Sequence, residues 1–152
     1  MIGEKIFDDI IKHDPQTINT LRSGDTIFDR SLLMEAAFRR DRSKWEKLFA
    51  IPHDLSIVNK IGWNVFHCVA LYDDNVRMME DLVTANVDGI NQRNVLGLTP
   101  LHEAAYRNQH QMIRKMLTSS SIDVNIRNNG GELADEYSLC DDTTKEIIRS
   151  FR

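Results

Sequence analysis

The stretch TPLHEAAYRNQHQMIRKML, residues 99–117, contains two helical patterns in succession. Thr99 is placed to cap the first helix with its hydroxyl, and Pro100 suits the first helical position, where no backbone N–H is needed. The paired alanines Ala104 and Ala105 leave room for a neighbouring helix to approach closely. The second pattern places four apolar side chains on one helical face: Met112, Ile113, Met116 and Leu117. The stretch therefore predicts a helix–turn–helix unit.

This unit recurs along the chain, at residues 31–49 (SLLMEAAFRRDRSKWEKLF) and 64–83 (NVFHCVALYDDNVRMMEDLV). The apolar anchors of the second helix repeat every 34 residues, in two series: Leu48, Leu82 and Met116, and Trp45, Met79 and Ile113. A glycine recurs on nearly the same period, at Gly62, Gly97 and Gly131. A period of this length is typical of stacked repeats, because neighbouring units bury a core that no unit buries alone.

Polar stretches rich in asparagine and glycine follow the units: HDLSIVNKIG (53–62), DGINQRNVLG (88–97) and IDVNIRNNGG (122–131). Each alternates apolar and polar residues and ends on turn residues, which predicts an extended, hairpin-like loop. We call these three stretches the fingers.

The motif Thr99-Pro100-Leu101-His102-Glu103-Ala104-Ala105, followed by Ile122-Asp123-Val124-Asn125, resembles an ankyrin repeat. Residues 64–70 (NVFHCVA) are a weaker copy that keeps the histidine and the last alanine. Residues 31–37 (SLLMEAA) keep the double alanine but carry Met34 in place of the histidine. The resemblance covers residues 26–151.

The resemblance implies an all-α ankyrin-repeat solenoid of stacked helix–turn–helix units with hairpin-like finger loops. We expect a single domain over residues 1–152. Its parts are an N-terminal half-repeat or cap (1–25), three repeats (26–58, 59–93 and 94–127) and a C-terminal capping repeat (128–152).

Composition narrows the classes of function. The formal net charge is −4, and no segment is rich in lysine or arginine, so nucleic acid is not an expected partner. No apolar run approaches the roughly 18 residues of a membrane span, so no membrane partner is expected. Two cysteines do not form a disulfide framework, which favours a reducing compartment. We expect the cytoplasm or nucleus, or a host cell's cytosol for a viral or bacterial effector.

Candidate catalytic residues are few. His67 and Cys68 are adjacent, but neighbours on a helix point about 100° apart and do not face one another. The family resemblance instead implies that His67 and His102 bond backbone groups of the fingers. The five histidines are scattered, so no metal and no cofactor are expected. An enzyme that uses His67, Cys68 or His102 remains the less favoured alternative.

The most informative signal is apolar side chains where a repeat ordinarily shows polar surface. They lie on either side of the shared glycines and directly after the second alanine of the first helix. In the ankyrin family these positions line the concave partner surface. Carried over to this chain, the expected partner-binding residues, with their rim, are Phe28, Phe38, Arg39, Ile61, Trp63, Leu71, Tyr72, Leu96, Leu98, Tyr106 and Arg107. The alternative is that several of them pack between neighbouring fingers.

Together these features predict a non-catalytic protein–protein interaction module, an adaptor or an inhibitor. The expected partner is another protein that offers an apolar or helical segment to the concave groove. The alternative is a self-association or assembly protein that forms a homo-oligomer through the same apolar face.

Overall fold

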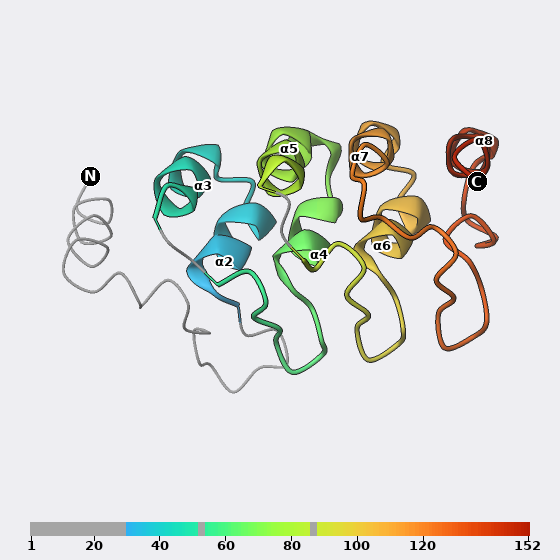
Figure 1. Cartoon of the computed structure of the whole chain (residues 1–152), viewed down its shortest axis with the longest axis horizontal. Coiled ribbons are helices and arrows are strands. Elements are labelled where there is room, and N and C mark those ends of the chain that lie inside the picture. Colours follow the sequence, from blue (N-terminus) through green and yellow to red (C-terminus); the bar gives the residue numbers. More distant parts are fainter. Residues whose placement is uncertain (1–29, 52–53, 86–87) are drawn as a thin grey trace.

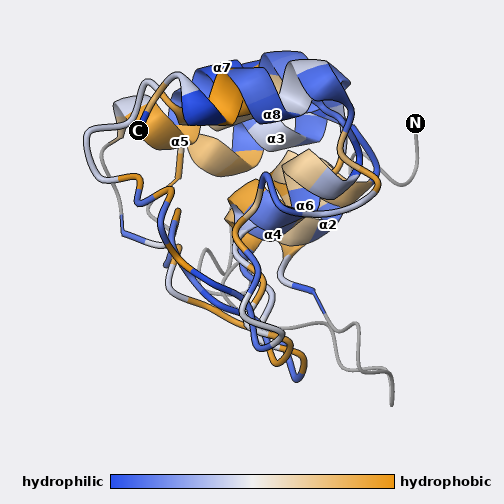
Figure 2. Ribbon diagram, turned by 90° about the vertical axis from the view of Figure 1, so that its right-hand side faces the viewer, coloured by the Kyte–Doolittle hydropathy of each residue, from blue (hydrophilic) through white to orange (hydrophobic). Residues whose placement is uncertain are grey.

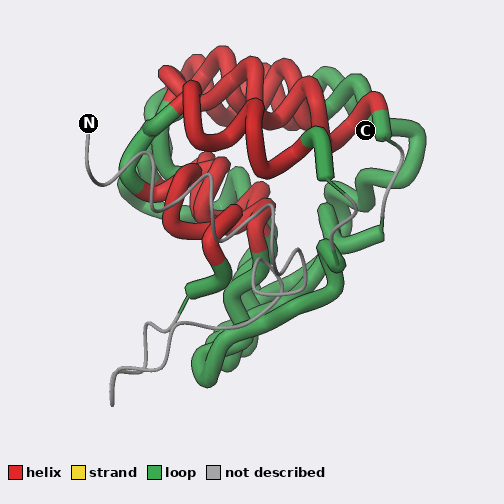
Figure 3. The backbone as a smooth tube through the Cα atoms, turned by 90° about the vertical axis from the view of Figure 1, so that its left-hand side faces the viewer, coloured by secondary structure: helices red, strands yellow, loops and turns green. Residues whose placement is uncertain are grey.

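The computed structural model describes residues 30–51, 54–85 and 88–152, in which it places seven α-helices and one 3-10 helix and no strand. The helices are α2 (Leu32–Phe38), α3 (Arg42–Phe49), α4 (Val65–Ala70), η2 (Asp73–Asn75), α5 (Val76–Thr84), α6 (Pro100–Tyr106), α7 (His110–Met116) and α8 (Asp142–Arg149). They form two layers, with α2, α4 and α6 in one and α3, α5, α7 and α8 in the other (Figure 1). The finger loops extend from one side of these layers, and the short turns within each helix pair lie on another (Figure 3). The predicted all-α solenoid is confirmed.

We call α2, α4 and α6 the inner helices, because their N-termini adjoin the fingers. Each begins at a residue whose side-chain oxygen accepts a hydrogen bond from the backbone N–H three residues later: Ser31, Asn64 and Thr99. The predicted roles of Thr99 as cap and Pro100 as the first helical residue are confirmed. Such caps matter here because helices of six or seven residues have little stability of their own.

The core lies between the two layers. The anchors Trp45, Met79 and Ile113 are each 0% exposed, and so is Ile148, one further period along the chain. Ala37, Ala70 and Ala105, at the matching place on the inner helices, are also 0% exposed. The repeated alanines therefore set the spacing of the inner helices. Leu117 is only partly buried, so the fully buried face of α7 ends at Met116.

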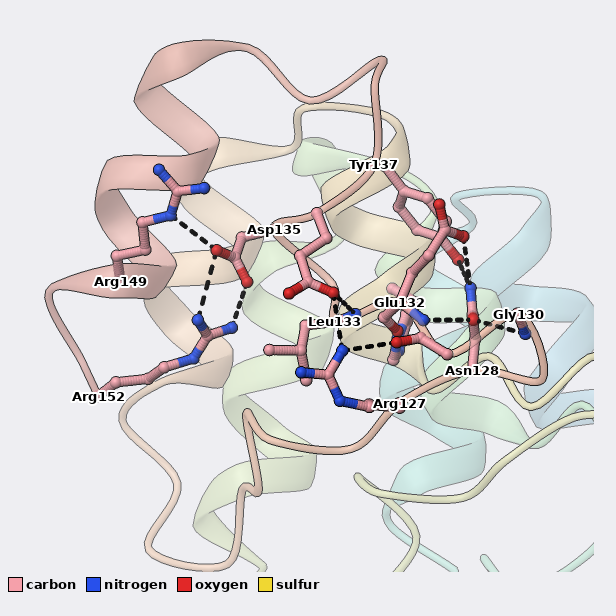
Figure 4. Close-up of polar contacts among 12 residues, drawn as sticks. Arg127, Asn128, Gly130, Glu132, Leu133, Asp135, Tyr137, Arg149 and Arg152 are labelled. Carbon is pink, nitrogen blue, oxygen red and sulfur yellow. Dashed lines mark hydrogen bonds and ion pairs between the residues drawn. The ribbon is translucent and has the colours of Figure 1, made fainter.

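The last repeat differs from the expected helix pair. Only its outer helix, α8, forms, and residues 133–141 make turns instead. The Asp135 side chain is 1% exposed and pairs with Arg149 at 2.8 Å and with Arg152 (Figure 4). Burial alone would raise the pKa of this carboxyl, but hydrogen bonds from the two guanidinium groups hold it below its usual range. The ion pairs of this buried carboxylate thus link the turns to α8 and to the residues that follow it.

The expected N-terminal half-repeat or cap, residues 1–25, lies outside the described residues, and so does Phe28. The described helix pairs fall inside the expected repeats: α2 and α3 in 26–58, α4 and α5 in 59–93, and α6 and α7 in 94–127.

A buried asparagine shapes each finger. The Asn94 Oδ1 atom accepts hydrogen bonds from the backbone N–H groups of Leu96 (2.9 Å) and Leu98 (3.0 Å), and Asn59 and Asn128 repeat the arrangement. Backbone bonds then join neighbouring fingers, from Val95 N–H to Ile61 O and from Asn129 N–H to Leu96 O, both 3.0 Å. The fingers are therefore a braced row and not independent loops.

Glycine is required where these turns close. Gly97 has φ +76°, in the left-handed region, and a Cβ atom there would lie 2.5 Å from Asn129 Oδ1. The recurring glycine in the sequence marks this close approach between one finger and the next.

His67 on α4 and His102 on α6 each connect their inner helix to the backbone at the end of the following finger. The Nδ1 atom of His102 accepts a hydrogen bond from Thr99 N–H (3.2 Å), so the proton is on Nε2, which donates to Glu132 O (3.2 Å). His67 repeats this between Asn64 N–H (3.3 Å) and Leu98 O (3.1 Å). The expectation that both rings bond finger backbone is confirmed.

Replacing Ala104 by leucine is expected to destabilise the fold by about 1–3 kcal/mol, because the larger side chain must force adjacent inner helices apart. Ala104 is 0% exposed. The same substitution at the exposed Ala85 is the control and is expected to leave the melting temperature nearly unchanged. Urea unfolding of both variants measures the difference. Equal stabilities would show that alanine packing does not set the helix spacing.

Acidification is expected to weaken the fold between pH 6.5 and about 4. Burial lowers the pKa of His67 from 6.5 to about 4. In this window the unfolded chain takes up a proton that the folded chain does not, so the free energy of unfolding falls as the pH falls. The full shift corresponds to a loss on the order of 3 kcal/mol. Urea titrations at successive pH values measure the slope.

The variant His67→Gln removes this titrating group and is expected to flatten most of the slope. Burial also lowers the pKa of His102, so this imidazole contributes to the slope that remains. If the variant keeps the full pH dependence of the parent, the imidazole of His67 is not the group responsible.

Candidate functional site

Four of the residues expected at a partner surface lie together around one pocket of about 440 Å³: Leu96, Leu98, Tyr106 and Arg107. The pocket lies between α6 and the two fingers that flank it, 88–97 and 122–131. Leu96 is 61% exposed and Tyr106 48% exposed, values high for large apolar side chains. The structure therefore brings the finger-tip and inner-helix positions of the third repeat to one place.

Tyr137 completes the pocket from the last repeat. Its ring lies edge-on to Tyr106, with centroids 6.0 Å apart and an angle of 83°, and edge-on to His102, at 5.9 Å and 70°. Its hydroxyl accepts a hydrogen bond from Asn128 Nδ2 at 3.1 Å, as Figure 4 shows. Burial raises the pKa of this phenol, so it stays neutral at physiological pH. The pocket therefore has a fixed aromatic wall.

The finger tips extend this apolar surface away from the pocket. Val95, next to Leu96, is 59% exposed, and Val58 on the preceding finger is 40% exposed. The ribbon coloured by hydropathy shows hydrophobic segments at the ends of the fingers (Figure 2). These side chains form a row because the fingers themselves are joined by backbone hydrogen bonds.

The first repeat offers a different surface. The Arg30 guanidinium lies 3.8 Å from the centroid of the Phe38 ring, which is half-buried beneath it. Arg39, expected at the rim, is exposed and pairs with Glu35. The Arg30 side chain therefore covers this part of the inner face.

The second repeat is intermediate in exposure between the first and the third. Trp63 is half-buried, packs against the core and stacks on His67 with ring centroids 5.9 Å apart. Ile61 is also half-buried, and Tyr72 lies under the Arg40 guanidinium, 5.1 Å from it. Leu71 departs from the expected pattern, because its side chain is 3% exposed. Leu71 is therefore not part of the exposed surface, since a partner could not reach its side chain without moving the helix.

Sequence reasoning missed Tyr137, Glu103 and Asn129, all of which line the pocket. Tyr137 follows no repeat register, because the last repeat has turns in place of an inner helix. The sequence does contain a signal for Glu103, because it is a charged residue directly before the two alanines that pack the inner helix.

The candidate catalytic residues His67, Cys68 and His102 are buried and serve the packing and hydrogen bonding of the fold. Cys68 is 0% exposed, and burial raises the pKa of its thiol to about 12, so it holds its proton at neutral pH. His67 and His102 use both ring nitrogens in backbone bonds. The described residues contain no group of three or more His, Cys, Asp or Glu side chains that could hold a metal ion. No helix in this part of the chain is long and apolar enough to cross a membrane.

Comparison with known families fits this geometry. A family model described as ankyrin repeats, in three copies, matches residues 33–128, from α2 to the third finger. A search of curated proteins returned no match. The matched range covers more than half of the chain and includes α6, the helix that lines the pocket. The chain belongs to the ankyrin-repeat family.

Proposed function

We propose that this chain is a non-catalytic interaction module that binds a protein segment in the groove between α6 and the fingers. Ankyrin repeats generally mediate protein–protein interactions. The observation that carries the proposal is the pocket of about 440 Å³ beside Leu96, Tyr106 and Tyr137. Exposed aromatic and apolar side chains gathered at one concavity are typical of binding hot spots.

The groove is suited to binding because it is preformed. Its fingers are joined to one another by backbone bonds and to the inner helices by His67 and His102. Little ordering is then needed on association, so apolar contacts contribute more of their energy to affinity. The expected ligand is a segment that places an apolar side chain between Leu96 and Tyr106.

The proposal assigns the binding energy to the third and fourth repeats and less of it to the first. Phe38 and Tyr72 are each covered by an arginine of the chain, and Leu71 is buried. Tyr106 has no such cover among the described residues. A chain that binds through this groove would act as an adaptor, or as an inhibitor that occludes its partner's surface.

We infer a site of action in the cytoplasm or nucleus. Both cysteines, Cys68 and Cys140, are free and buried, which suits a reducing compartment where no disulfide forms.

Leu96→Ala and Tyr106→Ala are each expected to weaken partner binding about tenfold or more, because truncating an interface anchor often costs about 2 kcal/mol. The partner is first captured from a cell lysate with the unaltered chain, and its affinity for each variant is then measured by calorimetric titration. Thermal melts of the same variants should change little, since both side chains are about half exposed or more.

Leu139→Ala is the matched control. Leu139 is 60% exposed, as Leu96 is at 61%, but it does not line the pocket. If all three variants bind alike, the groove is not the partner surface. A sedimentation experiment on the chain alone distinguishes the alternative: a dimer that dissociates on Leu96→Ala would assign the apolar face to self-association.

A further inference from the structure

Glu103 is a buried carboxylate in the pocket. It is 8% exposed, lies on α6 and lines the pocket. Its carboxylate makes no hydrogen bond or ion pair with any described residue, although the positive charge of Arg107 acts on it from a distance. Burial raises the pKa of this carboxyl. An unpaired buried charge costs folding free energy, and such residues are often kept for binding.

In the first repeat, the carboxylate at the position of Glu103 is paired with arginine. Glu35 occupies the place of Glu103, four residues after the cap of its inner helix. Its carboxylate accepts a hydrogen bond from Arg30 at 3.4 Å and pairs with Arg39. The same Arg30 guanidinium stacks at 3.8 Å over Phe38, which occupies the place of Tyr106. One arginine thus joins a carboxylate and an aromatic ring.

The third repeat has the carboxylate and the ring but lacks this cation. The position that corresponds to Arg30, directly before the helix cap, is Leu98. Arg107 corresponds to Arg39, but it is exposed and makes no ion pair with Glu103 within the part of the chain that the structure describes. Where Arg30 fills the inner face of the first repeat, the third repeat has an open pocket of about 440 Å³.

We propose that this pocket receives an arginine side chain of the partner segment, whose guanidinium pairs with Glu103 and stacks on Tyr106. The inference rests on the proposed function, because it names the side chain that the groove recognises. The partner's arginine takes the place that Arg30 holds in the first repeat. Arginine suits the site because a planar guanidinium can bond a carboxylate and stack on a ring at the same time.

The other charges at the pocket are consistent with this assignment. Glu132 adds a second carboxylate to the lining, with one oxygen bonded by Asn128 Nδ2 at 3.1 Å. Arg107 is the one cation of the lining, and its exposed side chain can stay in water while a second guanidinium enters. The aromatic pair Tyr106 and Tyr137 supplies faces and edges for a delocalised cation.

The probe is arginine capped as N-acetyl-arginine methylamide, titrated into the folded chain and followed by backbone amide shifts in NMR. Shifts are expected at the pocket, around Leu98, Tyr106 and Tyr137, with a dissociation constant on the order of 1 mM, as for ligands of this size. The same compound built on citrulline has nearly the same shape without the charge, and is expected to bind about tenfold more weakly or not at all. Equal binding of the two compounds would overturn the proposal.

Glu103→Gln is expected to lose most of the preference for arginine over citrulline. Glu80→Gln changes the net charge equally on the outer helix α5, and is expected to keep that preference. Because Glu103 is unpaired, its variant should melt no lower than the parent, which separates a loss of binding from a loss of fold. A Glu103→Gln chain that still discriminates the two compounds contradicts the assignment.

Leu98→Arg rebuilds the first repeat's arrangement inside the third. The new side chain is expected to pair with Glu103, to block the capped arginine and to raise the melting temperature. Undiminished binding of the probe by this variant would overturn the inference. Such a failure leaves the proposed function standing if Leu96→Ala and Tyr106→Ala still weaken binding of the captured partner, so the two failures are distinguishable.

Discussion

Two buried imidazoles, His67 and His102, join the inner helices to the fingers. Each ring accepts from the backbone at the start of its own inner helix and donates to the finger of the next repeat, at 3.1 Å for His67 and 3.2 Å for His102. These bonds hold the following fingers against α4 and α6, and the asparagine turns and the backbone bonds between fingers complete the groove. Because burial keeps both rings neutral, each has one donor and one acceptor, which is what the geometry requires.

Because the units repeat, equivalent side chains are placed at regular intervals along one surface. Alanines at 0% exposure hold the inner helices close, and the asparagine turns place finger tips at the same spacing. Side chains at one repeat position therefore form a row across the molecule. What differs between repeats is how each row position is filled: Arg30 over Phe38 in the first, Trp63 on His67 in the second, and an open pocket beside Tyr106 in the third.

The sequence predicted those parts of the structure that depend on period and on local chemistry. The spacing of Trp45, Met79 and Ile113 identified the core, and the motif around Thr99 identified a capped helix whose histidine bonds a finger. It did not predict that Leu71 is buried, because the same repeat position is exposed in Tyr106. Nor could it place Tyr137, since the turns that bring this ring to the pocket depend on the buried Asp135 and its two arginines, contacts that no repeat pattern encodes.

Hydrogen exchange of the backbone amides, measured with and without the captured partner, tests directly whether the groove binds it. If the groove is the binding surface, exchange should slow at the tips of the fingers, around residues 95–98 and 129–132, and at the end of α6. Exchange in α5 and α7, the outer helices, should stay the same. Slowing confined to those outer helices, with the fingers unchanged, would contradict the central claim.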